Sequence, residues 1–204
     1  MNTARQKNEK GEGRQGRGRA GKRKSRRKTD NRSKRKKRKK RKVKGRMRNI
    51  VLTRIDDRLI HGQVVTAWIR RYPINRILIV DDELSKNRLM ERIYRAAAPV
   101  GTEVLIKPVQ EAAAFLREDG ERGENILILV KVPQVIEALL EGEVEIKKVI
   151  LGGMAAGKGR KTFIRNVSAS REEIECMRHI SERGIELSYQ LVPDEKETDL
   201  KKLL

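Results

Sequence analysis

NIVLTRIDDRLIHGQVVTAW, residues 49–68, contains the unit from which the fold can be predicted. An apolar, β-branched run, Asn49–Arg54, indicates a strand, and the amphipathic segment Gln63–Tyr72 indicates a helix. Between them lies a short charged turn that ends in glycine. A strand whose residues are almost all apolar is typical of a parallel sheet covered by helices on both faces. The unit therefore predicts an α/β domain.

The same alternation continues towards the C-terminus. Further strands are predicted at Arg76–Asp81, Glu103–Lys107, Ile126–Val130, Lys148–Leu151, Phe163–Val167 and Glu186–Val192. Further helices are predicted at Lys86–Ala97, Val109–Glu118, Pro133–Glu141 and Arg171–Arg183. We therefore expect an open, mostly parallel sheet of about seven strands, with helices on both faces. Such sheets bind their ligands beyond the carboxyl ends of the strands.

The charge of the chain is concentrated in its first 48 residues, which hold 25 Lys and Arg against three acidic residues. The remaining 156 residues are balanced, with 25 basic and 25 acidic side chains. We expect residues 1–47 to be a disordered basic extension, because they contain too few apolar side chains to form a core. Three interpretations stay open: a nucleic-acid-binding arm, attraction to an anionic membrane surface, or a mis-assigned start, with the true start at Met47.

Cysteine usage and hydropathy indicate the compartment. Cys176 is the only cysteine, so no disulfide can form within the chain, and a reducing compartment is expected. The sequence has neither the roughly 20 apolar residues of a membrane span nor the apolar core of a signal peptide. The protein is therefore expected to be cytoplasmic. No Cys/His cluster has the spacing of metal ligands, so neither a metal nor an organic cofactor is predicted.

The charged turn combines the groups that phosphoryl transfer needs. A neutral imidazole nitrogen, here on His61, is a nucleophile for phosphorus. Arg54 or Arg58 could bind the phosphoryl oxygens through paired N–H groups. Asp56 or Asp57 could accept the other ring N–H and so fix the imidazole. The alternative is that His61 is a loop or helix-cap residue among solvated charges.

Four further residues are site candidates because of their position. Gly62 begins the helix, where backbone N–H groups favour anions. Asp82 follows the second strand, and Gly152 and Gly153 follow the fifth. The stretch GGMAAGKG, residues 152–159, nearly matches a phosphate-binding P-loop, but Gly159 occupies the position of the required hydroxyl residue, so a nucleotide site is not favoured. A purely helix-capping role for Asp82 is an equal alternative.

The chain also resembles a known family. RIDDRLIHGQVVTAW (54–68) is similar to the phosphorylation-site segment of the IIB subunits of mannose/fructose/sorbose-type phosphoenolpyruvate:sugar phosphotransferase systems. Further similar stretches are ILIVDDELSKN (77–87), AAAPVGTEV (96–104), VILGGM (149–154) and RGIELSYQLVPDE (183–195). The resemblance covers residues 48–204 in the order of the family.

This resemblance implies that His61 accepts a phosphoryl group from a phosphohistidine of a separate IIA protein. His61 would then pass the group to a sugar taken up through the membrane subunits IIC and IID, at the inner face of the membrane. It implies that Arg58 binds the phosphate, that Asp56 orients the histidine, and that the last strand, assigned to Glu186–Val192, is antiparallel. The sugar and the oligomeric state are not determined, and a homodimer stays open. The rival hypothesis is a nucleic-acid-binding protein acting through its basic arm; a regulatory protein that uses His61 as a signal is a third.

Overall fold

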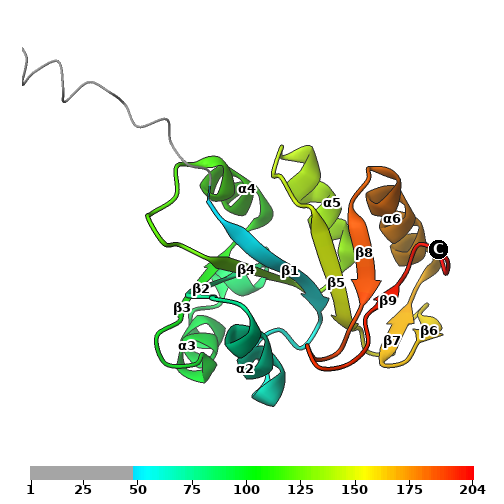
Figure 1. Ribbon diagram of the computed structural model, residues 1–204, viewed down its shortest axis with the longest axis horizontal. Coiled ribbons are helices and arrows are strands. Elements are labelled where there is room, and N and C mark those ends of the chain that lie inside the picture. Colours follow the sequence, from blue (N-terminus) through cyan, green and yellow to red (C-terminus); the bar gives the residue numbers. More distant parts are fainter. Residues whose placement is uncertain (1–47) are drawn as a thin grey trace, which may run out of the picture. The chain divides into compact units, whose positions relative to one another are not determined.

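The computed structural model describes residues 48–204 (Figure 1), so the predictions for residues 1–47 lie outside the described residues. The predicted α/β fold with a mostly parallel, seven-stranded sheet is confirmed, with the strand order β3-β2-β4-β1-β5-β8-β9. Its strands are β1 (Ile50–Asp56), β2 (Arg76–Val80), β3 (Glu103–Lys107), β4 (Ile126–Val130), β5 (Lys148–Gly153), β8 (Glu186–Tyr189) and β9 (Thr198–Asp199).

Helices cover both faces of the sheet (Figure 1). One face carries α2 (Gly62–Arg71), the 3-10 turn η1 (Leu84–Lys86) and α3 (Arg88–Ala97). The other carries α4 (Val109–Arg117), α5 (Pro133–Glu141) and α6 (Arg171–Glu182). Alternation within the strands explains the two layers, since successive strand residues point to opposite faces. In β4, Leu127 and Leu129 pack with α2, whereas Ile128 and Val130 pack with the α5 side.

The predicted antiparallel last strand is confirmed, but two assignments are wrong. The last strand is the short β9, whereas the segment Glu186–Tyr189, to which it was assigned, runs parallel to β5. The chain leaves the sheet after Tyr189 because the backbone carbonyls of Gln190 and Leu191 accept hydrogen bonds from the Arg54 side chain instead of a neighbouring strand. The segment predicted at Phe163–Val167 is not part of the main sheet. It belongs to a separate hairpin, β6 (Lys161–Ile164) and β7 (Val167–Ala169), which turns at Asn166 with a φ of 61°.

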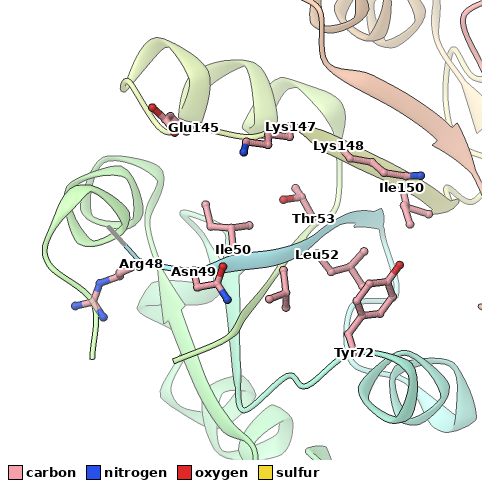
Figure 2. Close-up of a pocket in the computed structure, with 11 residues that line it drawn as sticks. Arg48, Asn49, Ile50, Leu52, Thr53, Tyr72, Glu145, Lys147, Lys148 and Ile150 are labelled. Carbon is pink, nitrogen blue, oxygen red and sulfur yellow. The ribbon is translucent and has the colours of Figure 1, made fainter. Parts of the chain in front are cut away.

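The two ends of the sheet differ in shape. We call the end at which β1, β2, β4 and β5 finish the carboxyl edge, and the opposite end the amino edge. At the amino edge β1 and β5 are paired only from Arg54 and Ile150 onwards, so the strands diverge before that point. The resulting groove has a volume of about 270 Å³, and Thr53, Tyr72 and Lys148 are among its lining residues (Figure 2). None of the predicted site residues lines it.

Among the described residues, no helix has both the length and the apolar character needed to cross a bilayer.

Candidate functional site

The predicted nucleophile lies where β1 gives way to α2, at the carboxyl edge. His61 has an extended backbone, with φ −146°, and is the residue immediately before the first turn of α2. The turn that precedes it is fixed by Leu59 and Ile60, whose side chains are 1% and 7% exposed. Leu59 has a φ of 55°, a conformation that is unfavourable for a residue with a Cβ, and its burial offsets that cost. The sequence therefore folds so that the imidazole sits at a helix start, where anions are favoured.

Arg54 lies inside the protein and not at the surface. Its side chain is 2% exposed and its guanidinium lies over the ring of Trp68, 5.2 Å from the centroid. The guanidinium donates to the carbonyl oxygens of Gln190 at 2.8 Å and Leu191 at 3.1 Å, and to Asp56 at 3.0 Å. Burial lowers its pKa, and Asp56 opposes that shift. Because its donors are engaged internally, the prediction that Arg54 binds the phosphoryl group is not supported.

Gly152 makes room for this arginine. A Cβ at residue 152 would lie 1.8 Å from Nη2 of Arg54 and 2.1 Å from its Cζ, so only glycine fits there. Gly153 lies beside the second arginine, and a Cβ there would meet Nη2 of Arg58 at 3.0 Å. The two glycines predicted as site candidates therefore allow the backbone of β5 to approach the two guanidinium groups closely.

Asp56 holds both arginines. It is 0% exposed, and its carboxylate accepts from Nη2 of Arg54 and from Nε of Arg58, the latter at 3.1 Å. Arg58 donates a second side-chain bond to Asp56, from Nη2 at 3.3 Å, while 48% of its side chain stays exposed. Asp56 therefore orients Arg58 towards solvent. This differs from the expectation that Asp56 orients the imidazole.

The imidazole is instead held by backbone. Nδ1 of His61 lies 2.9 Å from the carbonyl oxygen of Leu59. Because a carbonyl oxygen only accepts, a hydrogen bond here requires a proton on Nδ1. Nε2 is covered, and it has no hydrogen-bond partner among the residues whose side chains the structure describes. Both nitrogens are thus either bonded or covered, although the residue as a whole is partly exposed.

Asp57 connects the turn that carries His61 to the glycine-rich loop, residues 152–159. Its backbone N–H donates to the carbonyl of Gly153 at 3.1 Å, and its carboxylate accepts from the N–H of Ala155 at 2.6 Å. The glycine-rich loop is fixed at its other end by Arg160, which pairs with Glu173 at the start of α6. The expectation that Asp57 contacts the imidazole is therefore replaced by a role in shaping the glycine-rich loop.

Asp82 caps a helix. Its Oδ1 accepts from the N–H of Val109, the first residue of α4, at 2.8 Å, which is the capping role foreseen as an alternative to the site. Its neighbour Asp81 faces β4 and pairs with Lys131 at 2.8 Å. The Leu59 carbonyl was not predicted from the sequence as the partner of the imidazole. Lys131 was not singled out either, although it lies in residues 130–132, at one of the strand ends where ligand binding was expected.

Comparisons with known proteins identify the family. Residues 50–204 match the family model described as PTS system sorbose subfamily IIB component. The chain belongs to that family: it is a IIB phosphocarrier and phosphotransferase component that acts in sugar uptake.

Individual relatives support the assignment. The chain is 30% identical over 158 residues to the fructose-specific EIIB component of Bacillus subtilis, covering 78% of this chain and 97% of that one. It is 35% identical over 143 residues to the mannose-specific EIIAB component of Escherichia coli, covering 70% of this chain and 44% of that one. Among solved structures, the IIBSor domain of the sorbose permease from Klebsiella pneumoniae superposes with a TM-score of 0.73 at 29% identity, covering 76% of this chain and 95% of that chain.

Proposed function

We propose that His61 is the residue that carries the phosphoryl group, and that Arg58 binds the phosphoryl oxygens. The observation that carries this proposal is the juxtaposition of three features at the carboxyl edge. The imidazole lies at the start of α2, Arg58 lies three residues before it, and the buried carboxylate of Asp56 holds Arg58 with its guanidinium half exposed. Phosphoryl transfer needs little from the protein beyond such placement and electrostatic support.

The transfer has two steps. In the first, a nitrogen of His61 attacks the phosphorus of a phosphohistidine on the donor; the new N–P bond forms as the donor's N–P bond breaks, the ring of His61 gives up its N–H proton, and the donor imidazole takes up one proton. In the second, a sugar hydroxyl attacks the phosphorus on His61; the O–P bond forms as the N–P bond breaks, and the proton of the hydroxyl goes to the imidazole of His61. Either nitrogen requires a rearrangement first, because Nδ1 must release the Leu59 carbonyl and Nε2 must be uncovered. We infer that the ring turns when a partner docks.

The partners follow from the family. We propose that the donor is a IIA protein and that the acceptor is a sugar entering through the membrane subunits IIC and IID, so that the protein works in the cytoplasm at the inner face of the membrane. The name of the Escherichia coli relative, EIIAB, places A and B components on one chain. Residues 50–204 of this chain match the IIB model, which supports a IIA protein or domain as the donor. Relatives are named for fructose, mannose and sorbose, and the sugar carried here stays open.

The experiment uses radioactive phosphoenolpyruvate with enzyme I, HPr and a IIA protein. We expect an acid-labile label on the full chain and none on His61→Ala. The chain contains two histidines, so His179→Ala is the matched control and should take the label normally. Label that persists in His61→Ala and disappears in His179→Ala would reverse the assignment.

Arg58 is tested in the same assay. Arg58→Ala should slow labelling by about 10²-fold, because a charged group that supports the transition state is lost. Arg58→Lys should recover only part of the rate, since an ammonium lacks the planar fork of the guanidinium. Unchanged kinetics in Arg58→Ala would remove Arg58 from the site.

A further inference from the structure

A second cation lies at the carboxyl edge, and the mechanism above does not use it. Lys131 is the residue directly after β4, and its Nζ lies 2.8 Å from Oδ2 of Asp81, the residue directly after β2. The Lys131 side chain is 36% exposed, whereas that of Asp81 is 14% exposed. The ion pair is therefore open to solvent on the side of the lysine.

Sheet topology places Lys131 beside the phosphoryl site. The strand order runs β2-β4-β1, and Val130 of β4 is in register with Ile55 of β1. The next residues, Lys131 and Asp56, therefore lie at the carboxyl ends of two adjacent strands. By the alternation that sends Leu127 and Leu129 towards α2, Lys131 is on the same face as Asp56. Lys131, at the end of β4, therefore lies between Asp81, at the end of β2, and the turn after β1 that carries His61.

The charge balance of the site leaves a role for such a cation. Arg54 and Arg58 both pair with Asp56, so part of their positive charge is already neutralised before any phosphoryl group arrives. A phosphoryl group adds about two negative charges at neutral pH. Arg58 is the one of these two arginines with an exposed side chain, and a single guanidinium does not balance that charge.

Asp81 has hydrogen-bond donors other than Lys131. Its carboxylate also accepts from the backbone N–H groups of Glu83 at 3.0 Å and Leu84 at 2.8 Å. Burial by itself would raise the pKa of Asp81, but Lys131 and these two N–H groups together hold it below the ordinary value. These two backbone bonds do not depend on the ammonium, and an ion pair that is open to solvent on the side of the lysine is weak enough to exchange.

We propose that Lys131 is a second phosphate-binding cation, which rests on Asp81 and moves to the phosphoryl group when His61 carries it. This inference rests on the proposed function of His61. It assigns to Asp81 the role of a resting partner that positions the lysine, and it predicts that the phosphorylated protein has lost the Lys131–Asp81 pair. The four-carbon side chain of lysine, with its rotatable donors, suits such an exchange.

The test compares Lys131→Met with Lys131→Arg and with Lys147→Met, an exposed lysine at the amino edge. Single-turnover labelling of the full chain by phosphorylated IIA is measured at saturating donor. We expect Lys131→Met to lower the rate about tenfold, the loss expected for one charge-assisted hydrogen bond, and Lys131→Arg to keep most of the rate. Lys147→Met should match the wild type. Equal rates for Lys131→Met and the wild type would overturn the proposal while leaving His61 as the acceptor.

A double variant separates this role from a structural one. If Lys131 only neutralises Asp81, then Asp81→Asn should restore the rate of Lys131→Met, because the carboxylate that needed neutralising is gone. If Lys131 binds the phosphoryl group, Lys131→Met/Asp81→Asn should stay about as slow as Lys131→Met, whereas Asp81→Asn alone should be at least as fast as the wild type. Restoration in the double variant would overturn the proposal. A wild-type chain that takes no label on His61 would overturn both this inference and the function on which it rests.

Discussion

Gly152→Ala should destabilise the domain strongly, although it adds a single methyl group. The new Cβ would lie 1.8 Å from Nη2 of Arg54, 2.1 Å from Cζ and 2.7 Å from Nε. The clash involves the whole guanidinium and not only the tip of a flexible chain. Arg54 is 1% exposed and enclosed by Trp68, so it cannot simply swing into solvent from its present position. Either β5 or the arginine must move.

The expected loss in the free energy of unfolding follows from the contacts that Arg54 would lose. Displacing it breaks a buried ion pair with Asp56, and loss of one partner from such a pair costs about 3–5 kcal/mol. The carbonyls of Gln190 and Leu191 also lose a donor, at about 1 kcal/mol or more each if water does not replace it. Relaxation of the loop recovers part of this, so we expect a loss of about 4 kcal/mol in the free energy of unfolding.

Urea unfolding measures this change. Trp68 is the only tryptophan, is 1% exposed and contacts Arg54, so its fluorescence reports on the affected region. With a slope of about 2 kcal/mol per molar urea, the midpoint should fall by about 2 M. Gly157→Ala is the control in the same loop, because a Cβ there meets only Cδ of Arg160, at 3.8 Å. It should change stability by less than about 1 kcal/mol.

A loss below about 1 kcal/mol in Gly152→Ala would refute this reasoning, since it would mean that Arg54 is not needed where the structure places it. A double-mutant cycle with Arg54→Met gives a second check. Because Gly152→Ala acts through Arg54, the two changes should be far from additive. Additive losses would show that the methyl group disturbs something else.

Three further predictions follow from separate parts of the chain. Asp82→Ala should cost about 1 kcal/mol in urea unfolding through loss of the α4 cap, whereas Asp82→Asn should keep most of it; equal losses would contradict a capping role. Burial, together with Glu137, raises the pKa of Cys176 to about 12. Alkylation of the native thiol at pH 8 should therefore be about a thousandfold slower than that of a free thiol. The free energy of unfolding should also fall as pH rises from about 9 towards 12, because the thiol of the unfolded chain ionises at a lower pH than the thiol of the folded protein. A protein consisting of residues 47–204 should keep His61 labelling, because the family model begins at residue 50; loss of labelling together with loss of salt-sensitive RNA binding would favour the nucleic-acid hypothesis.

The sequence predicted the sheet well because its signals are local. Apolar strands of about five residues and the Ser170–Glu173 capping box can be read without knowing the tertiary structure, and the structure confirms both. The short strand Thr198–Asp199 was missed because two polar, exposed residues carry no strand pattern. Its pairing with β8 depends on where the chain returns after Pro193, which no local signal specifies.

The contacts of the candidate site could not be predicted from the sequence. The predicted strand ended at Arg54, and no local pattern shows that Arg54 is satisfied by carbonyls 136 and 137 residues further along the chain. The partner of the imidazole was missed for a different reason. It is the backbone of Leu59, two residues away, and a backbone acceptor depends on the conformation of the turn and not on the type of side chain.

This arrangement suits a carrier that must both accept and release phosphorus. A deep pocket with several fixed cations would stabilise the phosphorylated state and slow its discharge, because catalysis requires tighter binding of the transition state than of the bound ground state. Here two surface grooves lie away from His61, and the half-exposed guanidinium of Arg58 would meet the proposed phosphoryl group at a surface where water weakens the attraction. Under the proposed function, Arg58 and Lys131 would hold the phosphoryl group between transfers, and the docked donor or acceptor would add stabilisation only during transfer. The phosphoryl group would then be held on His61 without being trapped there.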